Sequence, residues 1–251
     1  DRLSANLKDL VFRASVIGND IDLVVLSEIS EYNKMEKLLR EGVEELVWNE
    51  VSKIIYAFRH ALLRDAAYNM QLKARLRSIH KNVASAIEKN YPGEDRFYSS
   101  LAFHYEKAEE VKKEKIYLKK AADYAAAQYH NVEAETMYLK LMDLLDDPKK
   151  LIETGHLLGK VAKISGKWDL AEKTFRESLE RAEDLGDKLL IADSMKELGY
   201  MLLEKGRYDE AQPLLDSAVK EYRALKETKG ECDVEGYRGL IHYYKGELDD
   251  E

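Results

Sequence analysis

Six histidines, one cysteine and several pairs of adjacent carboxylates are the residues of this chain whose types could support metal binding or catalysis. The histidines are His60, His80, His104, His130, His156 and His242. Each is at least 20 residues from the next, and none lies three or four residues from another or from Cys232. Metal sites built on one helix or turn need ligands at such short spacings. The sequence therefore predicts no local metal site.

Two of the histidines have large apolar neighbours. His60 and His80 lie beside Phe58 and Ile79, on stretches with helical periodicity. We predict that both are structural hydrogen-bonding residues, and pH sensing is the alternative role for an imidazole in such a place.

The string closest to a phosphate-binding loop is Gly155-His156-Leu157-Leu158-Gly159-Lys160-Val161. A functional loop has four residues between its glycines and a Ser or Thr after the Lys, which reaches magnesium. This string is one residue short and ends in Val. Acidic pairs such as Asp146-Asp147 fall at predicted turns, where carboxylates cap helices or face solvent. We therefore expect no catalytic residue, no cofactor and no enzymatic activity.

Composition indicates a helical protein. Among 251 residues, 35% are charged, while Pro is only 3 and Gly 13, which argues against an all-β fold. The longest apolar run, Leu23-Val24-Val25-Leu26, is far too short to span a membrane, and no signal peptide opens the chain. One cysteine fits a reducing compartment, so we expect a cytoplasmic protein. Because the chain begins at Asp1, we expect a piece of a longer protein.

The negative charge of the chain is unevenly distributed. Residues 1–100 carry 15 basic and 15 acidic side chains, and the remainder carries 25 basic and 33 acidic ones. A protein that binds nucleic acid without sequence preference needs a positive surface, so nucleic acid is not an expected partner. The one local group of cations is Lys73, Arg75, Arg77 and Lys81, for which a solvated helix face and a phosphate site are the two interpretations.

A domain boundary is predicted at Pro92. Asn90-Tyr91-Pro92-Gly93 ends a long helical pattern, and the change in charge balance occurs at the same place. We therefore divide the chain into residues 1–92 and residues 93–251.

The C-terminal half contains a repeat with a period of 40 residues. Leu158-Gly159 recurs as Leu198-Gly199, Gly166-Lys167-Trp168-Asp169 as Gly206-Arg207-Tyr208-Asp209, and Ala171 as Ala211. A third copy starts with Gly239, Gly246 and Asp249 at the same offset. The small residues would let two helices approach closely, and the Asp at each turn is expected to cap the second helix. Each copy is thus predicted to be a helix hairpin.

These recurring positions resemble the tetratricopeptide repeat, whose usual period is about 34 residues. The longer period here implies longer helices or connections. A weaker copy lies upstream, with Asn131-Val132-Glu133-Ala134 at its turn and no turn glycine. Before it, residues 97–110 are predicted to form another helix, with Leu101, His104, Tyr105 and Ala108 on one face.

The resemblance implies that the first helices of the repeats line a groove that binds a protein or peptide. Carried over by position, the groove residues are Glu153, His156, Lys160 and Lys163 from one repeat, and Lys196, Tyr200 and Glu204 from the next. The same positions also fit ordinary exposed helix residues, and the sequence does not choose between these two interpretations.

Residues 1–92 are predicted to contain helices and one β-hairpin, formed by the β-branched and aromatic residues of 47–48 and 54–58. This combination suggests a winged-helix arrangement. The order of motifs, Ala14-Ser15-Val16-Ile17-Gly18, then Leu46-Val47, then Phe58 to Tyr68 and Arg75 to Ala84, resembles the segment after the nucleotide-binding core of STAND/AAA-type signalling ATPases and soluble adenylate cyclase-like proteins. In those proteins helical repeats follow the winged helix.

The expected fold is thus mainly α, a small winged-helix-like module followed by a TPR-like α-solenoid. The expected function is a non-catalytic regulatory and protein-binding arm of a larger signalling ATPase or cyclase-associated protein, with an upstream ATPase domain in the same chain. The alternative is a DNA-binding winged-helix regulator with a TPR effector domain.

The last repeat is expected to be incomplete, since the sequence reaches Asp249-Asp250-Glu251 before a second helix can form. Its first helix then carries more apolar surface, at Leu240, Ile241, Tyr243 and Tyr244, than the preceding repeat can cover. We expect this end to self-associate or to be poorly ordered.

Overall fold

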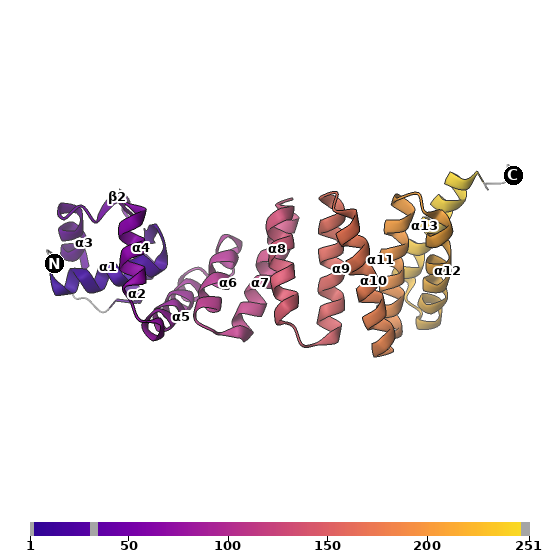
Figure 1. Ribbon diagram of the computed structural model, residues 1–251, viewed down its shortest axis with the longest axis horizontal. Coiled ribbons are helices and arrows are strands. Elements are labelled where there is room, and N and C mark those ends of the chain that lie inside the picture. Colours follow the sequence, from indigo (N-terminus) through magenta and orange to yellow (C-terminus); the bar gives the residue numbers. More distant parts are fainter. Residues whose placement is uncertain (1–2, 31–34, 247–251) are drawn as a thin grey trace. The chain divides into compact units, whose positions relative to one another are not determined.

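The computed structural model describes residues 3–30 and 35–246. Within these residues the chain forms thirteen α-helices, one short 3₁₀ helix and three β-strands (Figure 1), which confirms the mainly α fold. The chain divides into two compact units, residues 1–121 and 122–251, and the boundary lies inside α7 (Val111–Ala127). The predicted domain division at residue 92 lies between α5 (Lys73–Asn90) and η1 (Asp95–Phe97), and it stays a prediction.

The elements of the first unit are α1 (Ala5–Ile17), β1 (Asp20–Asp22), α2 (Leu23–Glu28), α3 (Met35–Glu44), β2 (Trp48–Ser52), β3 (Ile55–Phe58), α4 (Ala61–Asn69), α5, η1, α6 (Tyr98–Lys107) and the first part of α7. The helices and strands from α1 to β3 form its N-terminal module. The second unit contains the rest of α7 with α8 (Asn131–Leu144), α9 (Pro148–Ile164), α10 (Trp168–Leu185), α11 (Lys188–Glu204), α12 (Tyr208–Leu225) and α13 (Thr228–Lys245).

The predicted hairpin is present as β2 and β3, which pair antiparallel. A third strand, β1, pairs with the other edge of β3, so the strand order is β1-β3-β2. The sequence did not predict β1, because it has only three residues and Ile21 is the one that is buried. The order of these helices and strands is consistent with the predicted small winged-helix-like module.

Trp48 is the centre of the module. Its side chain is fully buried, and its indole Nε1 donates a hydrogen bond of 2.9 Å to the carbonyl oxygen of Leu39. A Cβ on Gly42 would lie only 2.3 Å from the indole ring, so the indole fills the space that a side chain at residue 42 would need. Gly42 therefore lets α3 pack closely against the hairpin.

Two histidines that are 24 residues apart in sequence meet in the first unit. The Nδ1 atoms of His80 and His104 are 2.9 Å apart, and the Tyr68 hydroxyl is 2.9 Å from Nε2 of His80. Burial lowers the pKa of His80 to about 4, with a further contribution from the nearby Lys107 ammonium, and burial lowers the pKa of His104 to about 3. Both rings are therefore neutral near pH 7, and one Nδ1 donates to the other.

This arrangement confirms the structural hydrogen-bonding role predicted for His80. The same prediction for His60 is wrong, because His60 is exposed and precedes the first turn of α4 without a capping hydrogen bond from its side chain. The helix predicted over residues 97–110 is confirmed as α6, with Leu101, His104, Tyr105 and Ala108 all buried.

The two clear repeats are the hairpins α9/α10 and α11/α12, whose antiparallel helices stand side by side in Figure 1. Gly159 on α9 faces the ring of Phe175 on α10, and Gly199 on α11 faces Leu215 on α12. The predicted packing role of these glycines is thus confirmed. The turn glycines Gly166 and Gly206 have φ values of +73° and +72°, in the left-handed region that favours glycine.

The weaker upstream copy makes its turn without glycine. Tyr129, between α7 and α8, takes a left-handed conformation with φ of +59°. The prediction that the turn Asp caps the second helix is wrong, because Asp169 and Asp209 lie inside the first turns of α10 and α12. At these positions the negative charge of each carboxylate interacts favourably with the positive end of the helix dipole. The capping aspartates instead precede the first helices, at Asp147 and Asp187.

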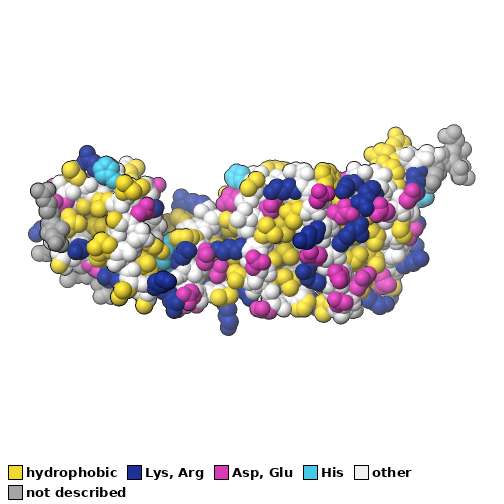
Figure 2. All heavy atoms as spheres, viewed as in Figure 1, with side chains coloured by type: hydrophobic (Ala, Val, Ile, Leu, Met, Phe, Trp, Pro, Cys, Tyr) yellow, Lys and Arg dark blue, Asp and Glu magenta, His cyan; other side chains and the backbone are white. Residues whose placement is uncertain are grey.

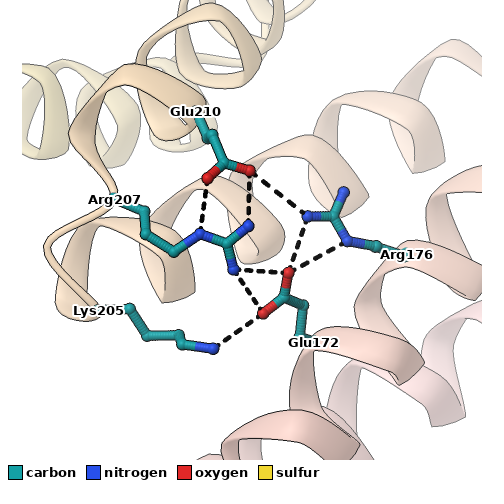
Figure 3. A network of polar contacts seen from close by, with 5 residues as sticks. All are labelled: Glu172, Arg176, Lys205, Arg207 and Glu210. Atoms are coloured by element: carbon teal, nitrogen blue, oxygen red, sulfur yellow. Dashed lines mark hydrogen bonds and ion pairs between the residues drawn. The ribbon is translucent and has the colours of Figure 1, made fainter.

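A network of charged residues joins the two hairpins (Figure 3). Glu172 on α10 accepts hydrogen bonds from Arg176 on its own helix, and from Lys205 and Arg207 in the turn between α11 and α12. Arg207 reaches Glu172 at 2.7 Å and also donates to Glu210 at 2.7 Å. Burial alone would raise the pKa of Glu172, but the three cationic donors outweigh it and lower that pKa to about 2.

We expect Glu172→Gln to lower the free energy of unfolding by about 1–3 kcal/mol, since charge-assisted hydrogen bonds are lost and three cations are left close together. Glu180→Gln, at an exposed position of the same helix, serves as the control. Because the folded pKa is depressed, this stabilisation is present above the ordinary pKa of 4.5 and is lost as the pH falls toward 2. Equal urea midpoints for Glu172→Gln and wild type at pH 7 would contradict this.

Candidate peptide-binding groove

The first helices of three successive repeats, α9, α11 and α13, line an open cavity of about 740 Å³ in the second unit. Of the seven predicted groove residues, five line it: Lys160, Lys163, Lys196, Tyr200 and Glu204. The other lining residues include Asp193, Glu197, Tyr222, Asp233 and Tyr237. The 40-residue repeat brings these side chains together, because it places equivalent positions of successive first helices next to one another.

The two remaining predicted residues do not line the cavity. His156 is buried, and its Nε2 atom is 2.8 Å from the Ser194 hydroxyl. Burial lowers the pKa of His156 to about 4, although nearby carboxylates oppose this shift. His156 therefore joins α9 to α11 behind the groove as a neutral ring. Glu153 is exposed on α9 and lies outside the residues that line the cavity.

Two ion pairs cross from α9 to α11 inside the groove. The Lys160 ammonium lies 2.8 Å from a carboxylate oxygen of Glu197, and the Lys163 ammonium lies 2.6 Å from one of Glu204. Lys163 also lies 4.2 Å from the centre of the Tyr200 ring, within the range of a cation–π interaction. These contacts hold long side chains in fixed positions along the groove.

Aromatic rings form the centre of the groove. Tyr200 on α11 stacks on Tyr237 on α13, with ring centres 4.3 Å apart and an angle of 23° between the ring planes. Tyr222 of α12 lies behind α11 and α13, and its hydroxyl donates a hydrogen bond of 2.6 Å to Asp193. Its ring fills the space beside Gly230, where an added Cβ would come within 2.4 Å.

Lys196 lies between two carboxylates of neighbouring repeats. Its ammonium is 3.7 Å from Asp193 on α11 and 3.8 Å from Asp233 on α13. Its side chain is only 17% exposed and passes 5.7 Å from the centre of the Tyr222 ring. Lys196 thus links two repeats through contacts that are longer than hydrogen bonds.

The three groove tyrosines share one direction of pKa shift. Burial raises the pKa of Tyr200 to about 12, with further contributions from the hydrogen bond and charge of Glu204. The pKa values of Tyr222 and Tyr237 are also raised, first by burial and then by nearby carboxylates. All three rings therefore keep their hydroxyl protons at neutral pH.

Ten of the lining residues were not predicted from the sequence, among them Asp193, Glu197, Asp233 and Tyr237. The 40-residue offset contains the signal that could have found these four. Glu153, Asp193 and Asp233 occupy equivalent positions of the three copies, and Glu197 and Tyr237 occupy another. The prediction used only two copies and a subset of the exposed helix positions.

The arrangement is suited to holding a ligand by contact. Within the described residues, no three His, Cys, Asp or Glu side chains are placed so that they could hold a metal ion. Across the same residues, no helix has the length and apolar character that a membrane span requires.

Three of the four cations in the local group on α5 form ion pairs with carboxylates. Arg75 pairs with Asp9, Arg77 with Glu109, and Lys81 with Glu110. These ion pairs favour the interpretation of this segment as a charged helix face.

The end of α13 has an exposed apolar surface. Leu240, Tyr243 and Tyr244 are 41%, 63% and 56% exposed, whereas Ile241 is buried. Tyr244 stacks on Tyr208 of the preceding repeat. The predicted stop at residues 249–251 lies outside the described residues.

The tetratricopeptide repeat family model matches residues 151–224, which cover α9 to α12 except for the first three residues of α9 and the last residue of α12. This region is therefore a tetratricopeptide region, as predicted. No curated protein matches the chain.

Three solved structures are similar to the chain. One is a signal transduction ATPase with numerous domains (STAND) protein with a tetratricopeptide repeat sensor, from Pyrococcus horikoshii, at 14% identity and a TM-score of 0.45 over 96% of this chain and 54% of that one. The second is BtubC from P. vanneervenii, at 16% identity and a TM-score of 0.49 over 66% of each chain. The third is a Rap protein complexed with competence and sporulation factor, at 14% identity and a TM-score of 0.47 over 96% of this chain and 71% of that one. The chain thus spans about half the length of the STAND protein.

Proposed function

We propose that the tetratricopeptide region is a non-catalytic scaffold in the cytoplasm and that it binds a protein or peptide segment in the groove of α9, α11 and α13. The observation that carries this proposal is the cavity of about 740 Å³, lined by the stacked pair Tyr200 and Tyr237 and by ordered polar side chains. Helical repeats use such surfaces to bind extended segments.

The groove is prepared for binding before a ligand arrives. Lys160 and Lys163 are held by carboxylates of the next repeat, and Lys196 is held between two more. A ligand therefore meets side chains that have already lost much of their conformational freedom, which reduces the entropic cost of binding.

The test is a selection from an unbiased library of 12-residue peptides, with the whole 251-residue chain as the target. Selected peptides are then measured by fluorescence anisotropy against wild type, Tyr200→Ala and Tyr237→Ala. We expect each groove substitution to weaken binding at least tenfold, because aromatic and centrally placed groups dominate binding energy. Lys173→Ala, on the exposed surface of α10, is the control.

If no selected peptide binds wild type more tightly than Tyr200→Ala, the proposal that the groove is the binding site is wrong. Circular dichroism of each variant establishes that the helices are intact.

We further propose that this scaffold is the regulatory arm of a larger signalling ATPase or cyclase-associated protein. The support is the winged-helix-like order of elements ahead of helical repeats, together with the motif resemblance of residues 14–84. In such a protein the first unit would adjoin an upstream ATPase domain of the same chain. An encoded sequence upstream of Asp1 without a phosphate-binding loop would contradict this proposal.

A DNA-binding regulator is the weaker alternative. In helix-turn-helix proteins the helix that enters the major groove carries the base and phosphate contacts. The corresponding α3 precedes the hairpin and carries Glu36, Glu41 and Glu44 against Lys37 and Arg40. With Arg75, Arg77 and Lys81 of α5 also paired, this surface has little positive charge to offer DNA. A gel shift with sequence-selective binding that is lost in Arg75→Ala/Arg77→Ala would favour the alternative.

Self-association through the end of α13 is also proposed. Its exposed Leu240, Tyr243 and Tyr244 could pack against the same surface of a second copy. Sedimentation velocity at increasing concentration, with wild type and Tyr243→Ser, tests this. A monomer at every concentration would contradict it.

A further inference from the structure

The charges that line the groove do not balance. Its acidic side chains are Asp193, Glu197, Glu204, Glu227 and Asp233, and its basic ones are Lys160, Lys163, Lys196 and Lys229. Glu197 and Glu204 each have a lysine partner within 2.8 Å. Asp193 and Asp233 instead share Lys196, at 3.7 and 3.8 Å. The part of the groove between α11 and α13 therefore has two carboxylates for one close cation.

The surrounding unit strengthens this negative potential. Residues 122–251 carry 29 acidic and 19 basic side chains, a formal charge of −10, whereas residues 1–121 carry 19 acidic and 21 basic ones. In Figure 2, side chains of both signs are interspersed over the visible face of α9 to α12. The field of the whole unit thus attracts cations, and a recessed groove concentrates such a field.

The aromatic part of the groove suits the same kind of ligand. Lys163 already lies over the Tyr200 ring at 4.2 Å, which shows that the rings here accept a cation on their face. The raised pKa values of Tyr222 and Tyr237 include contributions from Asp193 and Asp233, in agreement with surplus negative charge at this point.

From this geometry we infer that the ligand of the groove is a peptide segment with a Lys or Arg side chain next to an aromatic or aliphatic one. This inference rests on the proposed function and names the chemical class of its ligand. The cationic head contacts Asp193 and Asp233, and the apolar neighbour packs against the edges of the stacked rings of Tyr200 and Tyr237. The ion pairs of Lys160 and Lys163 remain in place and form the polar edge of the site.

The inference is tested with the peptides that the library selection yields, in three measurements. The first is the amino-acid composition of the selected peptides, in which Lys and Arg should be enriched beside an aromatic or aliphatic residue. The second is the response to Asp193→Asn/Asp233→Asn in the whole chain, which should weaken binding at least tenfold. The third is salt, where raising NaCl from 50 to 500 mM should weaken binding at least tenfold in wild type and less in the double variant.

The matched control is Glu183→Gln/Asp184→Asn, which removes the same two charges from exposed positions of α10 outside the groove. It should leave the affinity within threefold of wild type. Selected peptides that are acidic or neutral, or that bind the Asp193/Asp233 variant as tightly as wild type, would overturn the inference but leave the groove as a binding site. Selected peptides that bind Tyr200→Ala as tightly as wild type would overturn both proposals. Binding only by a second copy of the chain, detected as a dimer that Tyr200→Ala dissociates, would also overturn the inference.

Discussion

Replacing Gly159 by alanine is expected to lower the free energy of unfolding of the tetratricopeptide region by about 1–3 kcal/mol. An added Cβ would lie 2.4 Å from the ring of Phe175, which is itself almost fully buried. An aromatic ring is rigid, so the two helices must separate or the ring must leave its rotamer. This cost exceeds the gain of up to about 1 kcal/mol that alanine brings to a helix interior.

The matched control is Gly239→Ala in α13, where an added Cβ meets no atom within 4 Å. Alanine at that position gains helix propensity without a clash and should stabilise the protein by about 0.5–1 kcal/mol. Urea denaturation followed by circular dichroism compares the two variants. If both substitutions moved the midpoint in the same direction, the close contact between α9 and α10 would not be a determinant of stability.

Acidification is expected to destabilise the first unit steeply between about pH 6.5 and pH 4. The pKa values of His80 and His104 fall to about 4 and about 3 in the folded chain, against 6.5 for an ordinary histidine. In this interval the two histidines bind protons in the unfolded chain but stay neutral in the folded chain. The free energy of unfolding therefore falls as the pH falls. Each histidine contributes at most about 1.4 kcal/mol per pH unit.

His104→Asn separates this effect from general acid denaturation. An amide can keep the hydrogen bond to Nδ1 of His80 while removing one titrating group, so the dependence of stability on pH should become about half as steep. His60→Asn, at an exposed position, is the control. Identical slopes for His104→Asn and wild type between pH 6.5 and 4.5 would contradict this assignment.

The repeats could be predicted from the sequence because their packing depends on side-chain size at fixed intervals. Gly159 and Gly199 must be small to admit Phe175 and Leu215, and this demand recurs every 40 residues. Five groove residues, Lys160, Lys163, Lys196, Tyr200 and Glu204, were predicted through the resemblance to the tetratricopeptide repeat. Asp193 and Asp233 were not, since they look like ordinary exposed helix residues until their common position is compared.

The contacts that no local pattern encodes were missed. His80 and His104 belong to different helices, and only the packing of α5 against α6 brings their rings together. Strand β1 is too short to show an alternation of apolar and polar residues. Capping by the turn aspartates was predicted wrongly, because α10 and α12 begin before Asp169 and Asp209 and leave each Asp inside the first turn.

The link from Glu172 to Lys205 and Arg207 has a consequence for how the repeats melt. It ties α10 to the turn of the following hairpin, so each hairpin gains stability from its neighbour as well as from its own contacts. Such nearest-neighbour coupling makes opening a zipper-like process that starts where a hairpin has a neighbour on one side only. Amide protons of α9 and α10, which pack on helices at both sides, should then exchange with solvent more slowly than those of α13, the last helix of the described residues.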